Sequence, residues 1–600
     1  MAFSLVAAGY QFGRGNHHVY LLDAFRRNDP TLFANDWYVT QTLQYHGVFN
    51  RVAEGLIDLG MLQAGFFAFF LALVAFLHVG WYWLVRQLGG NSAVYLLSAV
   101  IFHIFAAGTV PGLYHFLQDS SFLPSNVAAV AMLWAIVLWN ARFPVLCGLL
   151  LGLAGLWHLN YAVVSVGLWV VLVGCYAFLP GQMPIFRGRP GSATPPPTSL
   201  GRLADRRLVL GTLLATVPSL VNIALALQVK LANTGTMPHA EFVNLYARLR
   251  HGHHYDPLAL PTVLWVIFLL PLPTTWLAWY ISRPAGTHVF ARREAAKVFL
   301  YFGVLLAVSF VFAGVWFVSE ALIQMSMWRF AVFVKLLSCI ATAWLLLAWR
   351  PWLRRATLAG LAVLAVVVTV GAATLHMPRA GPFIPEAASD YVTRIRPAIW
   401  LGVALLTASA LWLNLAPRLA RRRQRRLAFG GVAAVGLFLA AFATNPEGMT
   451  TPPPNSPEMI ALGDFARDNT PRDALFLTPP DDASFRLLAR RATVITFKSV
   501  PQLNGELPAW RDRLQDVLGL SDLMQLPRPY ELTLPAIARR YDSLPAEHLL
   551  DVAEQYDARY LVTRVPLNSP QLQLAWTASS RRLYLYDRTD RDRPGVAAAK

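Results

Sequence analysis

Residues 62–84, LQAGFFAFFLALVAFLHVGWYWL, form an apolar run that is long enough to cross a bilayer as one helix, and they decide the fold class. Similar runs recur along the first three quarters of the chain. They are expected at about residues 93–110, 126–140, 143–157, 160–179, 208–228, 261–281, 298–318, 329–348, 356–375, 398–416 and 427–443. We therefore predict a mainly α, polytopic transmembrane helix bundle over residues 1–443, with about 13 spans.

The thirteenth span rests on the N-terminus, MAFSLVAAGYQFG, whose apolar run is too short for a full span and lacks the basic start of a signal peptide. We expect it to be the outer end of a first helix whose beginning is missing. Residues 11–61 then form the first outer loop. Residues 180–207, with the Pro/Gly/Ser-rich stretch GRPGSATPPPTSLGR, form a cytoplasmic linker between two halves of the bundle.

Charge separates to the two sides of the bundle. When the loops between the runs are assigned alternately, one set holds 20 Lys/Arg and only two acids, Asp205 and Glu294, whereas the other holds 11 Lys/Arg and 11 acids. Short Lys/Arg-rich loops stay in the cytoplasm during insertion. The acid-bearing set is therefore expected outside a bacterial inner membrane.

Residues 444–600 have a different composition and are predicted to form an extracytoplasmic, periplasmic α/β domain. Short apolar runs of strand length (ALFLTP, ATVITF, RYLVT and RLYLYD) alternate with helix-like stretches (SPEMIALGDFARDN, ASFRLLARR and AEHLLDVAEQYDA). The region carries 19 basic and 20 acidic side chains, so the net charge of +18 lies entirely in the membrane part. This distribution indicates membrane topology and contact with membrane lipids, and it argues against a nucleic-acid partner.

The first outer loop, YQFGRGNHHVYLLDAFRRNDPTLFANDWYVTQTLQYHGVFN (residues 10–50), places carboxylates close to the membrane surface. In this respect, and in its many spans followed by an outer C-terminal domain, the chain resembles the C-type (GT-C) superfamily of membrane glycosyltransferases. The stretches ALGDFARDNTPRDALFLTPP and FRLLARRATVITFKSVP also resemble the outer domains of bacterial proteins of this kind. The resemblance implies a sugar donor linked to a polyprenyl phosphate, an acidic catalytic residue in the first loop, and a glycan, lipid or protein acceptor.

The chain departs from that family where the catalytic carboxylate usually follows the first span. Asn16, His17 and His18 stand there instead. Either His17 or His18 acts as the base, or Asp29 or Asp36 reaches the site, or the activity is lost. The alternative for Asp29 and Asp36 is ordinary turn formation.

A second candidate region is YARLRHGHHYDP (residues 246–257), in an outer loop. Arg248 and Arg250 could bind phosphate oxygens with several donors each, together with His253 and His254. His254 and Asp256 are also candidate ligands of a divalent metal ion, although two adjacent histidines do not easily face one ion. The competing interpretation is a polar loop at the start of a helix.

Arg329 and Lys335 are cations at the outer end of one span. An ionisable residue at membrane depth is a candidate functional residue, and both could hold the phosphate of a lipid-linked donor. Lys335 could equally extend its ammonium to the surface.

These features favour a membrane glycosyltransferase that uses a polyprenyl-phosphate-type sugar donor at the outer face. The departure at residues 16–18 supports an alternative, a catalytically inactive GT-C-like scaffold or binding protein. A transporter or flippase is less consistent with the long first loop and the outer domain. The sequence has no Walker or Rossmann nucleotide-binding signature, which argues against an ATP-driven pump.

Overall fold

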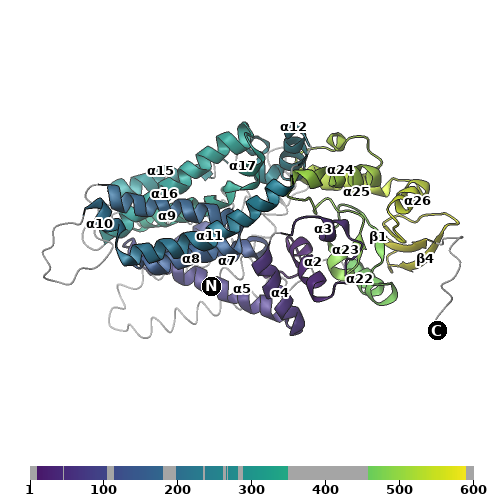
Figure 1. The fold of residues 1–600 in the computed structure, drawn as a ribbon, viewed down its shortest axis with the longest axis horizontal. Coiled ribbons are helices and arrows are strands. Elements are labelled where there is room, and N and C mark those ends of the chain that lie inside the picture. Colours follow the sequence, from purple (N-terminus) through teal and green to yellow (C-terminus); the bar gives the residue numbers. More distant parts are fainter. Residues whose placement is uncertain are drawn as a thin grey trace, which may run out of the picture.

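A computed structural model describes residues 10–348, apart from residues 45, 105–113, 180–197, 234, 236, 261–264, 266–267, 270 and 282–287, and residues 457–588. Long helices lie side by side in one part of the molecule, and a smaller part with a sheet follows at one end of them (Figure 1). The predicted spans at 356–375, 398–416 and 427–443, the boundary between residues 443 and 444 and most of the N-terminal run lie outside the described residues.

Among the described residues, five helices are long and apolar enough to cross a membrane. They are α5 (Leu62–Gln87), α9 (Leu159–Phe178), α11 (Arg206–Ala232), α16 (Val289–Ser309) continued by η5 (Phe310–Val315), and η6 (Met327–Phe330) continued by α18 (Ala331–Ala348). Shorter apolar helices are α6 (Ser92–Ile104), α7 (Pro124–Asn140), α8 (Pro144–Trp157) and α15 (Pro271–Ile281). Each corresponds to a span expected from the sequence, and the chain is a multi-pass membrane protein.

Helix α11 shows why the bundle requires a lipid environment. Only 22% of its most apolar window is buried inside the protein, and Leu213, Leu220 and Leu225 are more than half exposed. Its inward side packs closely on α8, because a Cβ atom added to Gly148 would lie 2.1 Å from the carbonyl oxygen of Gly211. Small residues allow two helices in a membrane to approach to this distance.

Residues of the predicted inner loops meet at the end of the bundle away from the sheet. His288 shares a hydrogen bond with the carbonyl oxygen of Gln87, and Arg292 donates to that of Leu88. One of the two inner acids, Glu294, is buried and accepts hydrogen bonds from Lys297 and from the indole of Trp139. Glu294 is therefore packed inside the bundle. This acid does not contradict the predicted excess of Lys and Arg in the inner loops.

The C-terminal part is an α/β unit with a five-stranded sheet in the order β2-β1-β3-β5-β4. The strands are β1 (Leu475–Leu477), β2 (Ala492–Thr493), β3 (Tyr560–Thr563), β4 (Leu572–Thr577) and β5 (Tyr584–Arg588). Strands β2, β1 and β3 run parallel, whereas β5 is antiparallel to both β3 and β4. The sequence predicted four of these strands and missed β4.

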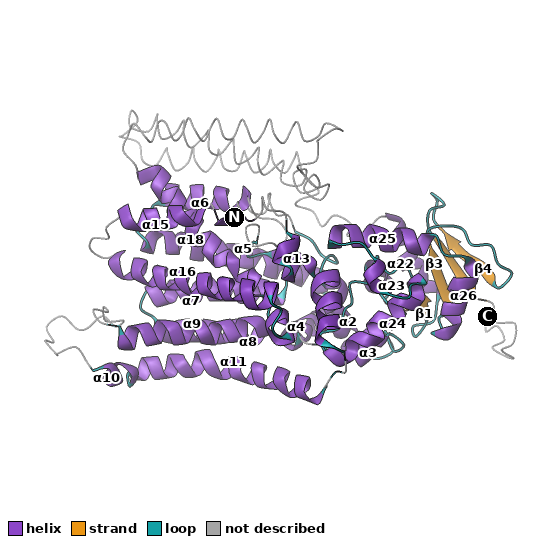
Figure 2. Ribbon diagram, turned by 90° about the horizontal axis from the view of Figure 1, so that it is seen from above, coloured by secondary structure: helices purple, strands orange, loops and turns teal. Residues whose placement is uncertain are grey.

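Five helices accompany the sheet. They are α22 (Pro457–Asn469), α23 (Ser484–Ala489), α24 (Leu507–Leu518), α25 (Tyr530–Asp542) and α26 (Ala546–Gln555). The sequence predicted α22, α23 and α26. Figure 2 shows α22, α23, α24 and α25 between the strands and the end of the bundle, and α26 beside the strands.

The α/β unit packs directly on the outer loops, and its hydrophobic core is continuous with that of the bundle. The first loop folds into α2 (His17–Asn28), α3 (Trp37–Gln41) and α4 (Gly47–Asp58), which lie between the two parts. Another contact joins the hydroxyl of Tyr246 to the side chain of Gln502 at 2.6 Å. The acid-bearing loops therefore gather at a single end of the bundle, next to the α/β unit, and we call this end the outer end.

Candidate functional site

The turn at residues 13–18 is held by its own backbone. The His17 ring is fully buried, accepts a hydrogen bond from the backbone N–H of Gly13 at 3.1 Å and donates to the carbonyl oxygen of Phe122 at 3.0 Å. Burial lowers the pKa of His17 to about 4. Both ring nitrogens of His17 are thus engaged, and its neutral form holds two outer loops together.

His18 lies beside it and is partly exposed, and its Nε2 donates to the carbonyl oxygen of Gly13 at 2.7 Å. Burial, followed by the charge of Lys498, lowers the pKa of His18 to about 3. His18 is therefore neutral at neutral pH.

The carboxylate of Asp119 lies at this turn, although it comes from the second outer loop. The backbone N–H of Asn16 donates to Asp119 Oδ2 at 3.1 Å. Gly15 has a φ of +54°, and a Cβ atom there would lie 2.4 Å from the same oxygen, so glycine is required for this approach. Asp119 is partly exposed. A carboxylate thus occupies the position where the first loop itself has Asn16, His17 and His18.

Lys498 approaches the same turn from the loop that follows β2 in the α/β unit. Burial, followed by the charge of Arg250, lowers the pKa of Lys498 to about 8, while Asp119 raises it. Its ammonium makes no ion pair within 4 Å in the described part of the chain, and the residue is partly exposed. Lys498 is thus a cation close to Asp119 and His18 without being neutralised by either.

Arg329 precedes α18 at the outer end of the bundle. One Nη atom donates to Nε2 of His158 at 2.8 Å, and the Nε atom is buried without a hydrogen-bond partner. Among the residues that the structure describes, no carboxylate lies within ion-pair distance of Arg329. A cation held away from water usually has an acidic partner, so an arginine without one is a candidate to bind an anion.

Neutral polar rings surround Arg329. Burial lowers the pKa of His46 to about 3, and Arg329 lowers it further. Burial raises the pKa of Tyr114 and of Tyr255, whereas the charge of Arg329 lowers both. Burial lowers the pKa of His254, and Arg329 is among the charges that lower it further. Within the described ranges, the residues around this arginine consequently offer hydrogen-bonding groups and no counter-charge. Two groups of residues therefore lie at this end of the bundle, Asp119 with His18 and Lys498, and Arg329 with His158. We call them together the outer-end cluster.

The two predicted first-loop acids lie in other contacts. Asp36 is completely buried and pairs with Arg486 at 3.2 Å, and it accepts hydrogen bonds from the backbone N–H groups of Val39 and Thr493. Asp29 pairs with Arg472 at 2.8 Å on the surface. Both acids fix the first loop to the α/β unit, and the catalytic role predicted for either remains untested.

Arg248 and Arg250 lie on η2 (Val243–Arg250) and differ in their contacts. Arg248 lies 5.2 Å from the ring centre of Phe317 and donates to the side chain of Asn244. Arg250 is buried and donates to the carbonyl oxygens of Phe497 and Lys498. Arg250 thus positions the loop that presents Lys498.

His253 and His254 have ring centres 4.1 Å apart, and the Nδ1 atom of each is buried without a partner. Burial lowers the pKa of His253 to about 3, and Arg250 and Lys498 lower it further. The carboxylate of Asp256 accepts from the backbone N–H of Leu258. Over the described ranges, no three His, Cys, Asp or Glu side chains converge as ligands of a metal ion, so a divalent metal stays a prediction.

Lys335 lies about 1.7 helical turns beyond Arg329 in the chain and is buried. Its ammonium donates to the carbonyl oxygen of Tyr114 at 3.0 Å and lies 4.1 Å from the ring centre of Phe102. Lys335 therefore supports the backbone of a residue that borders Arg329.

Sequence patterns singled out Arg329 and His18 but not Asp119, Lys498 or His158. Asp119 was detectable, because it is an acid in an outer loop between two spans. Lys498 and His158 produced no such signal, because their role depends on contacts between distant parts of the chain.

Comparisons with known proteins agree with this architecture. A family model described as a domain of unknown function (DUF6798) matches residues 457–517, which include Lys498. No curated protein matches the sequence. The crystal structure of ArnT from Cupriavidus metallidurans bound to undecaprenyl phosphate is similar at 14% identity and a TM-score of 0.50, over 98% of this chain and 95% of that one.

Two further structures are similar at lower scores. ArnT in the apo state gives 14% identity and a TM-score of 0.47, over 98% of this chain and 95% of that one. The archaeal oligosaccharyltransferase AglB from Archaeoglobus fulgidus, in complex with an inhibitory peptide and a dolichol-phosphate, gives 12% identity and a TM-score of 0.40, over 93% and 66%. ArnT and AglB are GT-C membrane glycosyltransferases. The chain thus has a fold similar to that of ArnT, in agreement with the resemblance to GT-C glycosyltransferases seen in the sequence.

Proposed function

We propose that this protein is a membrane glycosyltransferase that moves a sugar from a polyprenyl-phosphate-type donor to an acceptor hydroxyl at the outer end of the bundle. We place it in a bacterial inner membrane with the α/β unit in the periplasm, because the Lys/Arg-rich loops meet at the opposite end. The observation that carries the proposal is Arg329, a largely enclosed cation without a carboxylate partner in the described part of the chain.

Arg329 suits the phosphate of a lipid-linked donor. Its planar guanidinium offers several donors to phosphate oxygens, and it precedes α18 at the bundle end, where a lipid phosphate would lie. The undecaprenyl phosphate bound to the similar ArnT protein supports this ligand class. Lys498 supplies a second positive charge close to the site, which would stabilise the charge that develops on the departing phosphate.

Asp119 suits the role of general base in place of the acid missing at residues 16–18. In the proposed step the acceptor oxygen bonds to the anomeric carbon, the bond from that carbon to the phosphate oxygen breaks, and Asp119 takes the acceptor proton. The polyprenyl phosphate leaves as an anion beside Arg329 and Lys498. His17 is less suited as the base, because both of its ring nitrogens are already hydrogen-bonded.

A second candidate function is a scaffold with the GT-C fold and no turnover. The specific observation in its favour is that the first loop uses His17, Asp29 and Asp36 for contacts that hold the structure together. Such a protein could still bind the lipid phosphate. Binding and turnover must therefore be measured separately.

Binding of undecaprenyl phosphate to the full-length protein in detergent tests the proposal. Replacing Arg329 by Met should weaken binding about 10- to 100-fold, since one charge-assisted hydrogen-bonding group contributes about 1.5–3 kcal/mol. Arg142→Met, at the opposite end of the bundle, is the matched control and should bind as the wild type does. Undecaprenol, which lacks the phosphate, should not distinguish Arg329→Met from the wild type. Equal binding of undecaprenyl phosphate by both proteins would reject the assignment of Arg329.

A further inference from the structure

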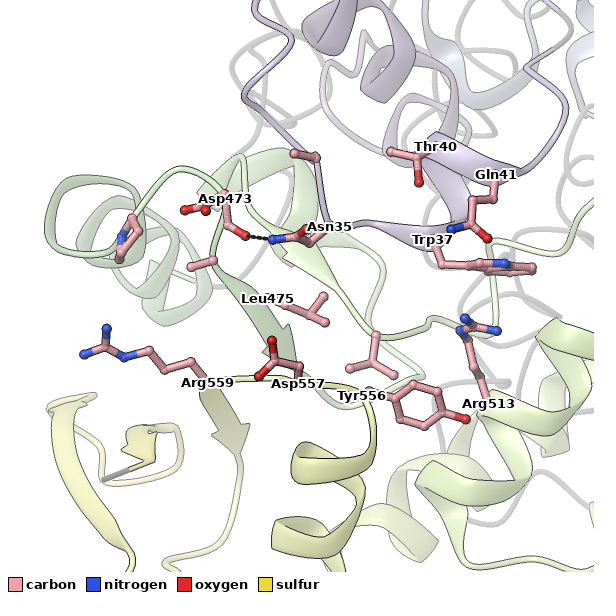
Figure 3. A pocket seen from close by; sticks show the side chains of 14 residues that line it. Asn35, Trp37, Thr40, Gln41, Asp473, Leu475, Arg513, Tyr556, Asp557 and Arg559 are labelled. Atoms are coloured by element: carbon pink, nitrogen blue, oxygen red, sulfur yellow. Dashed lines mark hydrogen bonds between the residues drawn. The ribbon is translucent and has the colours of Figure 1, made fainter. Parts of the chain in front are cut away.

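A pocket of about 480 Å3 lies outside the outer-end cluster, between residues 34–41 of the first loop and the α/β unit. This volume is within the usual range for small-molecule sites. Figure 3 shows Trp37, Arg513 and Tyr556 together on one side and Asp473 and Arg559 on the other. The pocket exists only where these two parts of the chain meet, since the side chain of Asn35 donates to the carbonyl oxygen of Asp473 at 2.7 Å.

Aromatic rings and a guanidinium form one side of the pocket. The centre of the Arg513 guanidinium lies 4.5 Å from the ring centre of Trp37 and 5.4 Å from that of Tyr556. The hydroxyl of Tyr556 donates to Asp516 at 2.5 Å, which fixes the ring. This side is therefore preorganised and combines flat apolar surface with N–H donors.

The rest of the lining is polar but close to neutral. Asp473 and Asp557 balance Arg513 and Arg559, and Arg559 is itself paired with Asp587 by two contacts of 2.8 Å. A strongly anionic or cationic ligand would gain little net attraction from such a lining. The pocket favours a ligand that is polar and uncharged.

Gln41 and Asp473 provide the free hydrogen-bonding groups. Both residues are exposed, and neither side chain makes a hydrogen bond to a described residue. The amide of Gln41 can donate and accept, and the carboxylate of Asp473 accepts. A sugar ring offers the matching set, because each hydroxyl both donates and accepts and its C–H face is flat enough to lie on an aromatic ring.

We propose that this pocket binds an uncharged pyranose unit of a glycan. The assignment of that glycan to the acceptor rests on the proposed function, whereas sugar binding itself does not. The pocket would then hold the acceptor at the junction of the first loop and the α/β unit, while the outer-end cluster holds the donor phosphate.

Saturation-transfer NMR on the full-length protein in detergent tests this proposal, with the methyl pyranosides of glucose, galactose, mannose and N-acetylglucosamine as probes. At least one should receive saturation. The double variant Gln41→Ala/Asp473→Ala should weaken its binding about tenfold or more, because two hydrogen bonds of about 1 kcal/mol each are removed. Asp468→Ala, an exposed acid outside the pocket, is the matched control and should leave binding unchanged.

The outcomes separate the two proposals. Absence of saturation for all four probes, unchanged binding by the double variant, or displacement of the sugar by inorganic phosphate would each overturn the carbohydrate assignment. Loss of sugar binding in the double variant, with undecaprenyl phosphate still bound, would support it. A protein that binds the methyl pyranoside and fails to bind undecaprenyl phosphate would overturn the donor assignment and leave the sugar pocket standing.

Discussion

Two arginines at the outer end of the bundle have opposite surroundings. Arg486 is 1% exposed and pairs with the completely buried Asp36, and it also donates to Thr496 and Ser499. Arg329 is partly buried, contacts an imidazole and has no carboxylate partner in the described residues. A buried ion pair needs no further counter-charge, whereas a cation without a carboxylate partner can be neutralised by a bound anion. The contrast separates a contact that holds the structure from one suited to function.

Asp36 and Asp119 differ in the same way, since one is fully paired and the other is not. Asp36 accepts hydrogen bonds from two backbone N–H groups in addition to its ion pair. Asp119 is partly exposed and has a single hydrogen-bond donor among the described residues, the backbone of Asn16. Charged residues that approach a partner without pairing with it are the better candidates for chemistry.

The largest expected effect is on turnover. Asp119→Asn removes the proposed base and should lower sugar transfer from polyprenyl donors by about two to four orders of magnitude. The amide keeps the size of the side chain and can still accept from Asn16, so folding and binding of undecaprenyl phosphate should persist. Transfer is measured in membranes that contain equal amounts of the two proteins.

Two results would contradict the role proposed for Asp119. Full activity of Asp119→Asn would remove Asp119 from the mechanism. If neither the wild type nor the variant transfers sugar while both bind undecaprenyl phosphate, the scaffold function would be supported instead.

The next largest effect is expected on stability, when Arg486 in its ion pair with Asp36 is replaced. Arg486→Met leaves Asp36 charged and buried and should lower the free energy of unfolding by about 3–5 kcal/mol. Adding Asp36→Asn should recover part of that loss, because the unpaired charge is removed. Thermal unfolding of the single and double variants in detergent measures both. A stable Arg486→Met protein would show that the pair is not needed for docking.

A smaller effect, on the order of 2 kcal/mol, should appear in the pH dependence of stability. Glu506 accepts from the backbone N–H of Leu43, its second oxygen is buried without a partner, and burial raises its pKa to about 7. The folded protein therefore favours the protonated acid, and stability should fall as the pH rises from about 4.5 through 7. Glu506→Gln should lack this fall. Parallel curves of melting temperature against pH for the two proteins would contradict the assignment.

The smallest effect is expected at the surface. Arg472 is 69% exposed in its pair with Asp29, and Arg472→Ala should cost at most about 1 kcal/mol, less at high salt. Unfolding at low and high salt measures it. A loss as large as that of Arg486→Met would mean that exposure does not distinguish the two links between the first loop and the α/β unit.

Much of the fold was predictable because apolar runs specify membrane helices directly. Helices α5, α9 and α11 lie within a few residues of the expected spans. Strand β4 was missed because it is an edge strand with mostly exposed side chains, so its sequence, LQLAWT, lacks a continuous apolar run. Helix α24 was missed because its polar positions are as many as its buried ones and interrupt the apolar pattern.

The site was less predictable, because its residues are joined only by the fold. Arg329 stands out in the sequence as a cation at the end of a span. Nothing in the chain near Asp36 indicates that its partner is Arg486, and nothing near Asn16 indicates that Asp119 lies against it. Local patterns identify residues that are unusual where they stand, whereas the contacts that separate a structural acid from a catalytic one are long-range.

The separation of 450 residues between Asp36 and Arg486 also sets an order of events during synthesis. At roughly 5–20 residues per second, the first loop waits roughly 20–90 s after Asp36 is made before its partner exists. During that time the carboxylate must stay hydrated. The first loop can reach its final packing only after the α/β unit has been made, so a chain released early would present an unfinished surface to the cell's proteases.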